Sequence, residues 1–174
     1  MIEVRVGDLS EAAVDAIVRP VAADFSAVTP AMRRFEQAAG ESVAEQCRRM
    51  GEIPVGSAII TAAGALDADL IIHVAVRSGT ENATGTAVRQ GFLNALRRAA
   101  EWGSRSIAVA PLGTGAANLD AETAADIMLE VLAARVREGG GPERVVLVVE
   151  DAYQESAFVN AVNRHLGERT GTNP

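Results

Sequence analysis

Short apolar runs alternate along this chain with longer amphipathic segments, and this alternation limits the possible folds more than any other feature. The runs have the length and the β-branched composition of buried strands. We predict strands at residues 1–6, 14–18, 57–61, 69–76, 105–110 and 144–149. Strands that alternate with helices form a mostly parallel sheet covered on both faces. The expected fold is α/β, a three-layer α/β/α sandwich around a mixed, mostly parallel sheet.

The segments between the runs carry helix signals. Thr29 and Pro30 suit a helix start, because Thr caps the first turn and Pro fits its first position. Asp151, with Gln154 three residues later, resembles a capping box. We predict helices from Pro30 to about Met50 with a break at Gly40, from 86 to the stop at Gly103, from Asp120 to the turn at 139–142, and from Asp151 to about Leu166.

Length and composition indicate one soluble globular domain. The chain has 174 residues, enough to bury a sizeable core, and 48% of them are hydrophobic. We expect a single domain over residues 1–166 and a mobile tail over 167–174. The N-terminus lacks the features of a signal peptide, and no apolar run is long enough to span a membrane. A cytoplasmic protein is therefore expected.

Charge and metal-ligand content exclude several function classes. The formal net charge is −7, whereas a sequence-independent nucleic-acid binder normally carries a basic patch. Cys47 is the single cysteine and cannot form an intramolecular disulfide. With only two histidines beside it, His73 and His165, there is no convincing zinc set, so we expect neither a metal nor a cofactor. We interpret Cys47 as a packed thiol and His73 as a hydrogen-bonded core residue.

A glycine-containing loop follows the predicted strand at 105–110. Gly113 and Gly115 permit backbone conformations closed to other residues, and they let a ligand approach the main chain. The N–H groups from Gly115 to Leu119 could then face one anion, helped by the dipole of the next helix. Two alternatives stay open: the loop is an ordinary strand-to-helix turn, and Asp120 caps that helix itself, in competition with an anion.

Asp8 follows the first predicted strand. Its carboxylate could accept a hydrogen bond from an exocyclic amine such as that of adenine. The alternative, an Asp that hydrogen-bonds its own turn, is favoured when the residue is considered alone.

Four ordered pieces of sequence resemble the macro domain, the module that binds ADP-ribose. They are "VGDLSEAAVDAIV", "PVGSAIIT", "DLIIHVAV" and "VAPLGTGAANLD", and the resemblance covers roughly residues 1–166. It implies that Asp8, beside Leu9, holds the adenine amine. It also implies that residues after the last strand flank the base, with Glu150, Asp151 and Tyr153 as candidates. Tyr153 could stack on the ring, and packing at a helix start is the alternative. The diphosphate loop maps onto Gly113, Thr114, Gly115, Ala116, Ala117 and Asn118.

The chain departs from the family pattern after the second strand. Where hydrolytic members carry two asparagines and an aspartate that orient the distal ribose and the attacking water, this chain has Arg19, Ala22 and Met32. Neither Ala22 nor Met32 can orient a water or accept a proton. The polyglycine stretch maps onto Ala27, Val28, Thr29 and Pro30, and Pro30 has no N–H. The aromatic residue that covers the ligand is also replaced, by Ala117.

Two charged residues near this altered segment are further candidates. Arg19 could bind a phosphate or carboxylate in bidentate fashion, and Asp24 could serve as a substitute base. For each of them, an ordinary surface charge is the favoured alternative.

Three functions fit these observations. The leading hypothesis is a module that binds ADP-ribose or a related adenine nucleotide, free or attached to a protein, without the usual hydrolase residues. The first alternative is a hydrolase of ADP-ribosyl groups or O-acetyl-ADP-ribose with an altered catalytic loop. The second is a structural or protein-interaction domain whose ligand site is closed by Phe25, Val28 and Met32.

Overall fold

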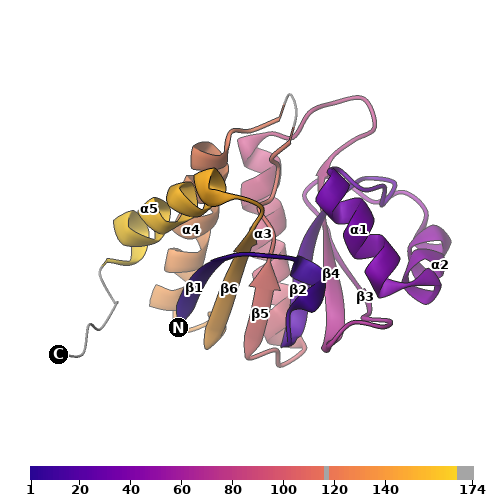
Figure 1. The fold of residues 1–174 in the computed structure, drawn as a ribbon, viewed down its shortest axis with the longest axis horizontal. Coiled ribbons are helices and arrows are strands. Elements are labelled where there is room, and N and C mark those ends of the chain that lie inside the picture. The colour runs from indigo at the N-terminus through magenta and orange to yellow at the C-terminus, as the bar shows by residue number, and fades with distance from the viewer. Residues whose placement is uncertain (116–117, 168–174) are drawn as a thin grey trace.

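In the computed structural model, which describes residues 1–115 and 118–167, one sheet has the strand order β1-β6-β5-β2-β4-β3 (Figure 1). Its strands are β1 (Ile2–Val6), β2 (Val14–Ala22), β3 (Ala58–Ala62), β4 (Ala68–Arg77), β5 (Ser106–Val109) and β6 (Arg144–Val149). The edge strand β3 pairs antiparallel with β4, and the other neighbouring pairs of this sheet are parallel. The expected mixed, mostly parallel sheet is confirmed.

Helices cover both faces of this sheet. They are α1 (Pro30–Ala39), α2 (Glu41–Met50), α3 (Gly85–Glu101), α4 (Ala121–Arg137) and α5 (Ala152–Leu166), with a short 3₁₀ turn at Leu9–Glu11. In Figure 1, α1 and α2 lie on one side of the molecule and α3, α4 and α5 on the other. Alternate residues of β2 enter the two cores: Ala16 packs with the α3–α5 layer and Ile17 with the α1–α2 layer. The three-layer α/β/α sandwich is confirmed.

The strand β2 is longer than the sequence pattern predicts. It continues four residues past Val18, through Arg19 and Pro20, and those residues are buried. A proline is tolerated here because β5 pairs with β2 only as far as Val18, so the missing N–H falls beyond that ladder. A register shift between Val21 and Ala22 then ends the strand. The extension carries Arg19 into the interior.

The predicted helix start and break are both present. Thr29 caps α1 by accepting a hydrogen bond from the Met32 N–H, and Pro30 is the first helical residue. Gly40 separates α1 from α2 with a φ of 96°, a conformation that favours glycine.

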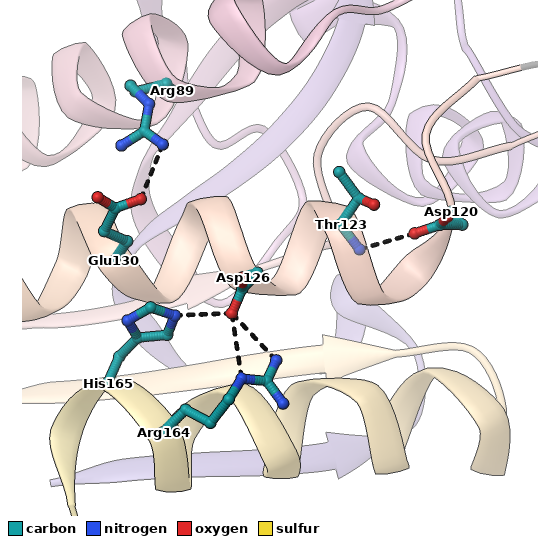
Figure 2. Close-up of polar contacts among 7 residues, drawn as sticks. All are labelled: Arg89, Asp120, Thr123, Asp126, Glu130, Arg164 and His165. Atoms are coloured by element: carbon teal, nitrogen blue, oxygen red, sulfur yellow. Dashed lines mark hydrogen bonds and ion pairs between the residues drawn. The ribbon is translucent and has the colours of Figure 1, made fainter.

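Polar side chains join the helices of the other layer (Figure 2). Arg89 of α3 pairs with Glu130 of α4 at 2.7 Å. Asp126 of α4 accepts hydrogen bonds from Arg164 and His165 at the end of α5. These contacts connect α3 to α4 and α4 to α5, in addition to the apolar core that the three helices share.

The predicted tail lies outside the described residues from 168 onward. Among the helices of the described ranges, none is long and apolar enough to cross a membrane.

Candidate functional site

A cleft opens at the carboxyl ends of the parallel strands, where ligands bind in sheets of this kind. Loops after β1, β6 and β5, the end of β2, and the first turns of α1 and α5 enclose it. Its cavity volume is about 110 Å³. The residues that line the cleft are Gly7, Asp8, Leu9, Pro20, Thr29, Ala31, Met32, Arg34, Ala110, Pro111, Thr114, Val148, Glu150 and Gln154.

Asp8 lies at the rim of the cleft and is exposed. Its Oδ1 atom accepts hydrogen bonds from the Ser10 N–H at 2.9 Å and the Ser10 hydroxyl at 2.7 Å, which caps the 3₁₀ turn that starts at Leu9. Its Oδ2 atom accepts none from the described residues. The turn therefore uses one carboxylate oxygen and leaves the other available for a ligand.

The glycine loop lies between β5 and α4, and its Thr114 lines the cleft, whereas Gly113 and Gly115 are not among the lining residues. Gly113 has a φ of 78°, and a Cβ there would lie 2.4 Å from the Val88 Cγ2 atom, so close packing against α3 requires glycine. Gly115 has a φ of 119°, and a Cβ there would meet the Thr29 Cγ2 atom at 3.5 Å. The loop thus lies against the first residues of α1. Ala116 and Ala117 lie outside the described residues.

The backbone donors at the end of this loop are used within the loop. The Asn118 N–H donates to the Gly115 carbonyl at 3.1 Å, and the Leu119 N–H donates to the Gly113 carbonyl at 3.0 Å. The Asn118 Oδ1 atom accepts from the Ala83 N–H at 2.7 Å. The expectation that the Asn118 and Leu119 N–H groups face an anion is wrong, because the turn needs both.

Asp120 occupies the N-terminus of α4. Figure 2 shows its carboxylate accepting from the Thr123 N–H, at 2.7 Å. Hydrogen bonding to Thr123 lowers the pKa of Asp120 below its usual value. The Asp120 carboxylate thus caps α4 and compensates the positive end of its dipole, which is the capping alternative stated for this residue.

The segment after β6 places its side chains in two directions. Glu150 lines the cleft, and its N–H donates to the Gln154 Oε1 atom at 2.9 Å. Asp151 caps α5 by accepting from the Gln154 N–H. The Tyr153 hydroxyl instead donates to the Glu122 carboxylate at 2.6 Å, and the side chain does not line the cleft. Stacking of Tyr153 on a base in the cleft therefore has no support in this geometry.

Arg19 lies beneath α1, away from the cleft. It is 2% exposed, its Nη1 atom pairs with the Glu36 Oε1 atom at 2.8 Å, and its guanidinium lies 5.6 Å from the centre of the Phe35 ring. The favoured expectation of a surface charge is wrong, because α1 folds over the extended β2 strand and supplies the carboxylate. The pairing uses one carboxylate oxygen rather than two.

His73 is fully buried and completes this contact. The Arg19 Nε–H donates to the His73 Nδ1 atom at 2.8 Å, so the ring proton is on Nε2, which lies 2.8 Å from the Thr61 hydroxyl. Burial, and secondly the charge of Arg19, hold the pKa of His73 well below its usual range. Cys47 is also buried, and burial raises the pKa of its thiol. The predictions of a core histidine and a packed thiol are confirmed.

The remaining candidates of the altered segment do not line the cleft either. Ala22 is 2% exposed, and its N–H donates to the Ser26 carbonyl. Asp24 is exposed and accepts two hydrogen bonds from Ser26, which lower its pKa. With Arg19 and Phe25, Asp24 borders a second cavity that shares no lining residue with the cleft.

Apolar side chains are packed in and around residues 27–30, the segment that corresponds to the polyglycine stretch of the family. Phe25 and Met32 are 5% and 4% exposed, and Val28 packs against both cores. Met32 also forms part of the cleft wall. Of the three side chains that the closed-site alternative names, Met32 alone is among the residues that line the cleft, and Phe25 borders the second cavity.

Three polar lining residues, Thr29, Arg34 and Gln154, are not among the ligand-binding residues that the sequence indicates. Arg34 lies three residues after Ala31, on the same face of α1, and this spacing is the available signal. For Gln154 the sequence indicates only a capping role. Among the described residues, no group of three or more His, Cys, Asp or Glu side chains could hold a metal ion.

Comparison with known proteins identifies the family of this chain. The family model described as "Macro domain" matches residues 28–128. Proteins named O-acetyl-ADP-ribose deacetylase are similar to this chain. The one from Enterobacter sp. (strain 638) is 32% identical over 86% of this chain and 87% of its own length. The one from Citrobacter rodentium is 31% identical, over 83% and 85%.

Solved structures show the same fold. The macrodomain of Oceanobacillus iheyensis with ADP has a TM-score of 0.85 at 21% identity, over 95% of this chain and 91% of its own. The Trypanosoma brucei macrodomain in complex with ADP has a TM-score of 0.82 at 18% identity, over 92% and 68%. With a family model matched over more than half of its length, and with the cleft at the expected edge of the sheet, the chain belongs to the macro domain family.

Proposed function

We propose that this protein binds ADP-ribose or a related adenine nucleotide in the cleft and lacks the usual hydrolase machinery. The observation that carries the proposal is that Asp8, the glycine loop and Glu150 border one cleft at the carboxyl edge of the sheet. The two macrodomain structures with ADP have the same fold as this chain and give the proposal its ligand class.

The adenine end of the ligand would be held beside Asp8. Its Oδ2 atom is available to accept from the exocyclic amine, and the neighbouring Leu9 lines the same wall. Glu150 and Gln154 form the opposite part of this end, after β6. Thr114 and Gly115 would follow the diphosphate, since Thr114 lines the cleft and Gly115 lies beside Thr29, which also lines it.

The residues near the altered segment supply no base for hydrolysis. Met32, which lines the cleft at the position of the family aspartate, has only a thioether, a weak acceptor. Ala22 is buried, and Asp24 borders the second cavity with its carboxylate engaged by Ser26. The acids among the described residues that line the cleft are Asp8 and Glu150, and the proposal places both at the adenine end.

The names of the relatives favour one competing function. Proteins about one-third identical are named O-acetyl-ADP-ribose deacetylases, so release of acetate is the activity to exclude. Incubation with O-acetyl-ADP-ribose, with acetate as the measured product, decides between binding and hydrolysis. Turnover at an ordinary enzymatic rate would contradict the non-catalytic part of the proposal.

Binding requires the cleft to widen. Its volume of about 110 Å³ is below the ~300–1,000 Å³ of typical small-molecule sites. The loop at 113–115 and the start of α1 lie close together beside Gly115 and Thr29 and would have to move apart. A site that cannot open would instead be the closed domain of the second alternative.

Calorimetric titration with ADP-ribose tests the proposal. The wild type should bind with micromolar affinity, and Asp8→Asn should weaken binding at least tenfold, since an amide NH₂ would face the adenine amine. Asn still caps the 3₁₀ turn, so the fold is preserved. Ser10→Ala is the matched control: it removes a turn contact and keeps the carboxylate. Absence of binding by the wild type would overturn the proposal.

A further inference from the structure

The cleft contains one cationic side chain among its described lining residues, Arg34 of α1. Arg34 is exposed, and no described carboxylate lies within ion-pair distance of it. Most other arginines of the described residues do form ion pairs, so an unpaired arginine that borders a ligand cleft is distinctive in this acidic protein. Its neighbour Arg33 is exposed too but does not line the cleft.

The backbone supplies few donors for a phosphate in this cleft. Pro30 has no N–H, and the Met32 N–H donates to the Thr29 hydroxyl. On the other side, the Asn118 and Leu119 N–H groups are used within the glycine loop. A doubly charged diphosphate would therefore meet fewer N–H groups than two glycine-rich loops would offer.

Helix geometry inclines the Arg34 side chain toward the N-terminal end of α1, since side chains on a helix slope in that direction. Ala31, one turn earlier on α1, also lines the cleft. Thr29, which caps that turn, lies beside Gly115, because a Cβ added to Gly115 would be 3.5 Å from the Thr29 Cγ2 atom. Arg34 thus lines the cleft from the helix whose N-terminal end lies beside the glycine loop.

We propose that Arg34 binds a phosphate group of the nucleotide, in place of the backbone donors that Pro30, Met32, Asn118 and Leu119 do not offer. The inference rests on the proposed function, because it assigns the nucleotide to this cleft. Guanidinium groups suit the task, since they donate two parallel N–H bonds to phosphate oxygens and stay charged at all physiological pH values. Arg34 would then determine specificity, favouring phosphorylated adenine ligands over adenosine.

A ligand series tests this assignment by calorimetry. Wild type, Arg34→Ala, Arg34→Lys and Arg33→Ala are each titrated with adenosine, AMP, ADP and ADP-ribose. Arg34→Ala should weaken binding of ADP and ADP-ribose roughly 10- to 100-fold, as expected for a charge-assisted hydrogen bond, and leave adenosine unchanged. Arg34→Lys should recover part of the loss. Arg33→Ala, which changes the net charge equally, should bind all four ligands like the wild type.

Salt dependence provides a second readout. If Arg34 neutralises a phosphate, the affinity of the wild type for ADP should fall with rising salt more steeply than that of Arg34→Ala. Equal losses for adenosine and ADP would overturn the assignment, because Arg34 would then act on the base or on the shape of the cleft. Unchanged ADP binding by Arg34→Ala would also overturn it. A wild type that binds ADP-ribose despite either result leaves the proposed function standing, whereas a wild type that binds nothing overturns both.

Discussion

Arg19 on β2 donates its Nε–H to the Nδ1 atom of His73, its register partner on β4, at 2.8 Å in the interior of the protein. The same guanidinium reaches across to Glu36 on α1. A position that could have bound a ligand therefore connects the sheet to the helix that forms one wall of the cleft. Removing one of these partners should lower the free energy of unfolding. It should change ligand binding only indirectly, if α1 shifts.

Glu36→Gln should destabilise the protein. The substitution keeps the shape of the side chain but leaves the charge of Arg19 buried without a carboxylate. Because the Glu36 side chain is about one-third exposed, we expect a loss of about 1–2 kcal/mol in the free energy of unfolding, measured with urea. Glu45→Gln breaks the exposed pair with Arg49 and is the matched control, with an expected change near zero. Equal effects in the two variants would contradict the buried role of Glu36.

His73 should stay neutral well below pH 6. Its pKa is lowered in the folded state, so the unfolded chain binds more protons as the pH falls through the unfolded value of about 6.5. Stability from this residue is therefore full above that pH and is lost below it, by up to ~1.4 kcal/mol per pH unit. Nitrogen chemical shifts of the imidazole report its charge, and His165→Gln assigns the two histidines. Titration of His73 near 6.5 would refute the hydrogen-bonded arrangement.

The sheet and its helices were predictable because their signals are local. Residues 145–149 of β6 are continuously apolar, and Gly40 breaks a helical pattern, so each can be recognised within a few residues. The burial of Arg19 has no such signal. Its partners Glu36 and His73 lie 17 and 54 residues away in the sequence, so only the folded chain shows that its charge is satisfied. Arg19 and Pro20, which follow the apolar run, therefore led to a predicted strand end at Val18. The structure places the end of β2 four residues later, at Ala22.

The sequence indicates which loop residues line the cleft but not which helix residues do. Asp8, Thr114 and Glu150 follow strands, and strand ends converge at one edge of a parallel sheet, so all three line the cleft. Whether Tyr153 or Gln154 faces the cleft depends instead on how α5 is rotated. That rotation is set by packing of residues such as Phe158 against the sheet and by the contact between Tyr153 and Glu122.

Gly113→Ala should destabilise the fold more than Gly115→Ala. Both positions have positive φ, which disfavours a side chain, but only at Gly113 would the new Cβ meet an immobile neighbour, the Val88 Cγ2 atom at 2.4 Å. We expect about 2–4 kcal/mol for Gly113→Ala, from strain and overpacking together, and about 1–2 kcal/mol for Gly115→Ala, from strain alone. Urea unfolding of the two variants gives the comparison. The reverse order would show that α3 does not restrict the loop.

Asp126→Asn should weaken the connection between α4 and α5 drawn in Figure 2. Hydrogen bonds from His165, and secondly from Arg164, lower the pKa of Asp126. Its contribution is thus present above its unfolded value near 4 and disappears as the carboxylate is protonated at lower pH. Since the side chain is half exposed, we expect only ~0.5 kcal/mol at pH 7, measured by urea unfolding. Glu130→Gln, on the exposed pair with Arg89, tests whether any loss of charge on α4 has the same effect.

Tyr153 and Gln154 give opposite predictions for ligand binding, although they are neighbours on α5. Tyr153 is 60% exposed and its hydroxyl donates to Glu122, so Tyr153→Ala should leave the affinity for ADP-ribose within about twofold, as expected for a side chain without ligand contact. Gln154 lines the cleft and holds the Glu150 N–H, so Gln154→Ala should weaken binding about three- to tenfold through the loss of one neutral hydrogen bond. Both variants keep the Asp151 cap, which accepts from the backbone N–H of residue 154, and so α5 should remain intact. Calorimetry with ADP-ribose measures both. A large loss for Tyr153→Ala alone would mean that α5 rotates on binding and brings the aromatic ring over the base, which would restore the stacking role that the sequence suggested.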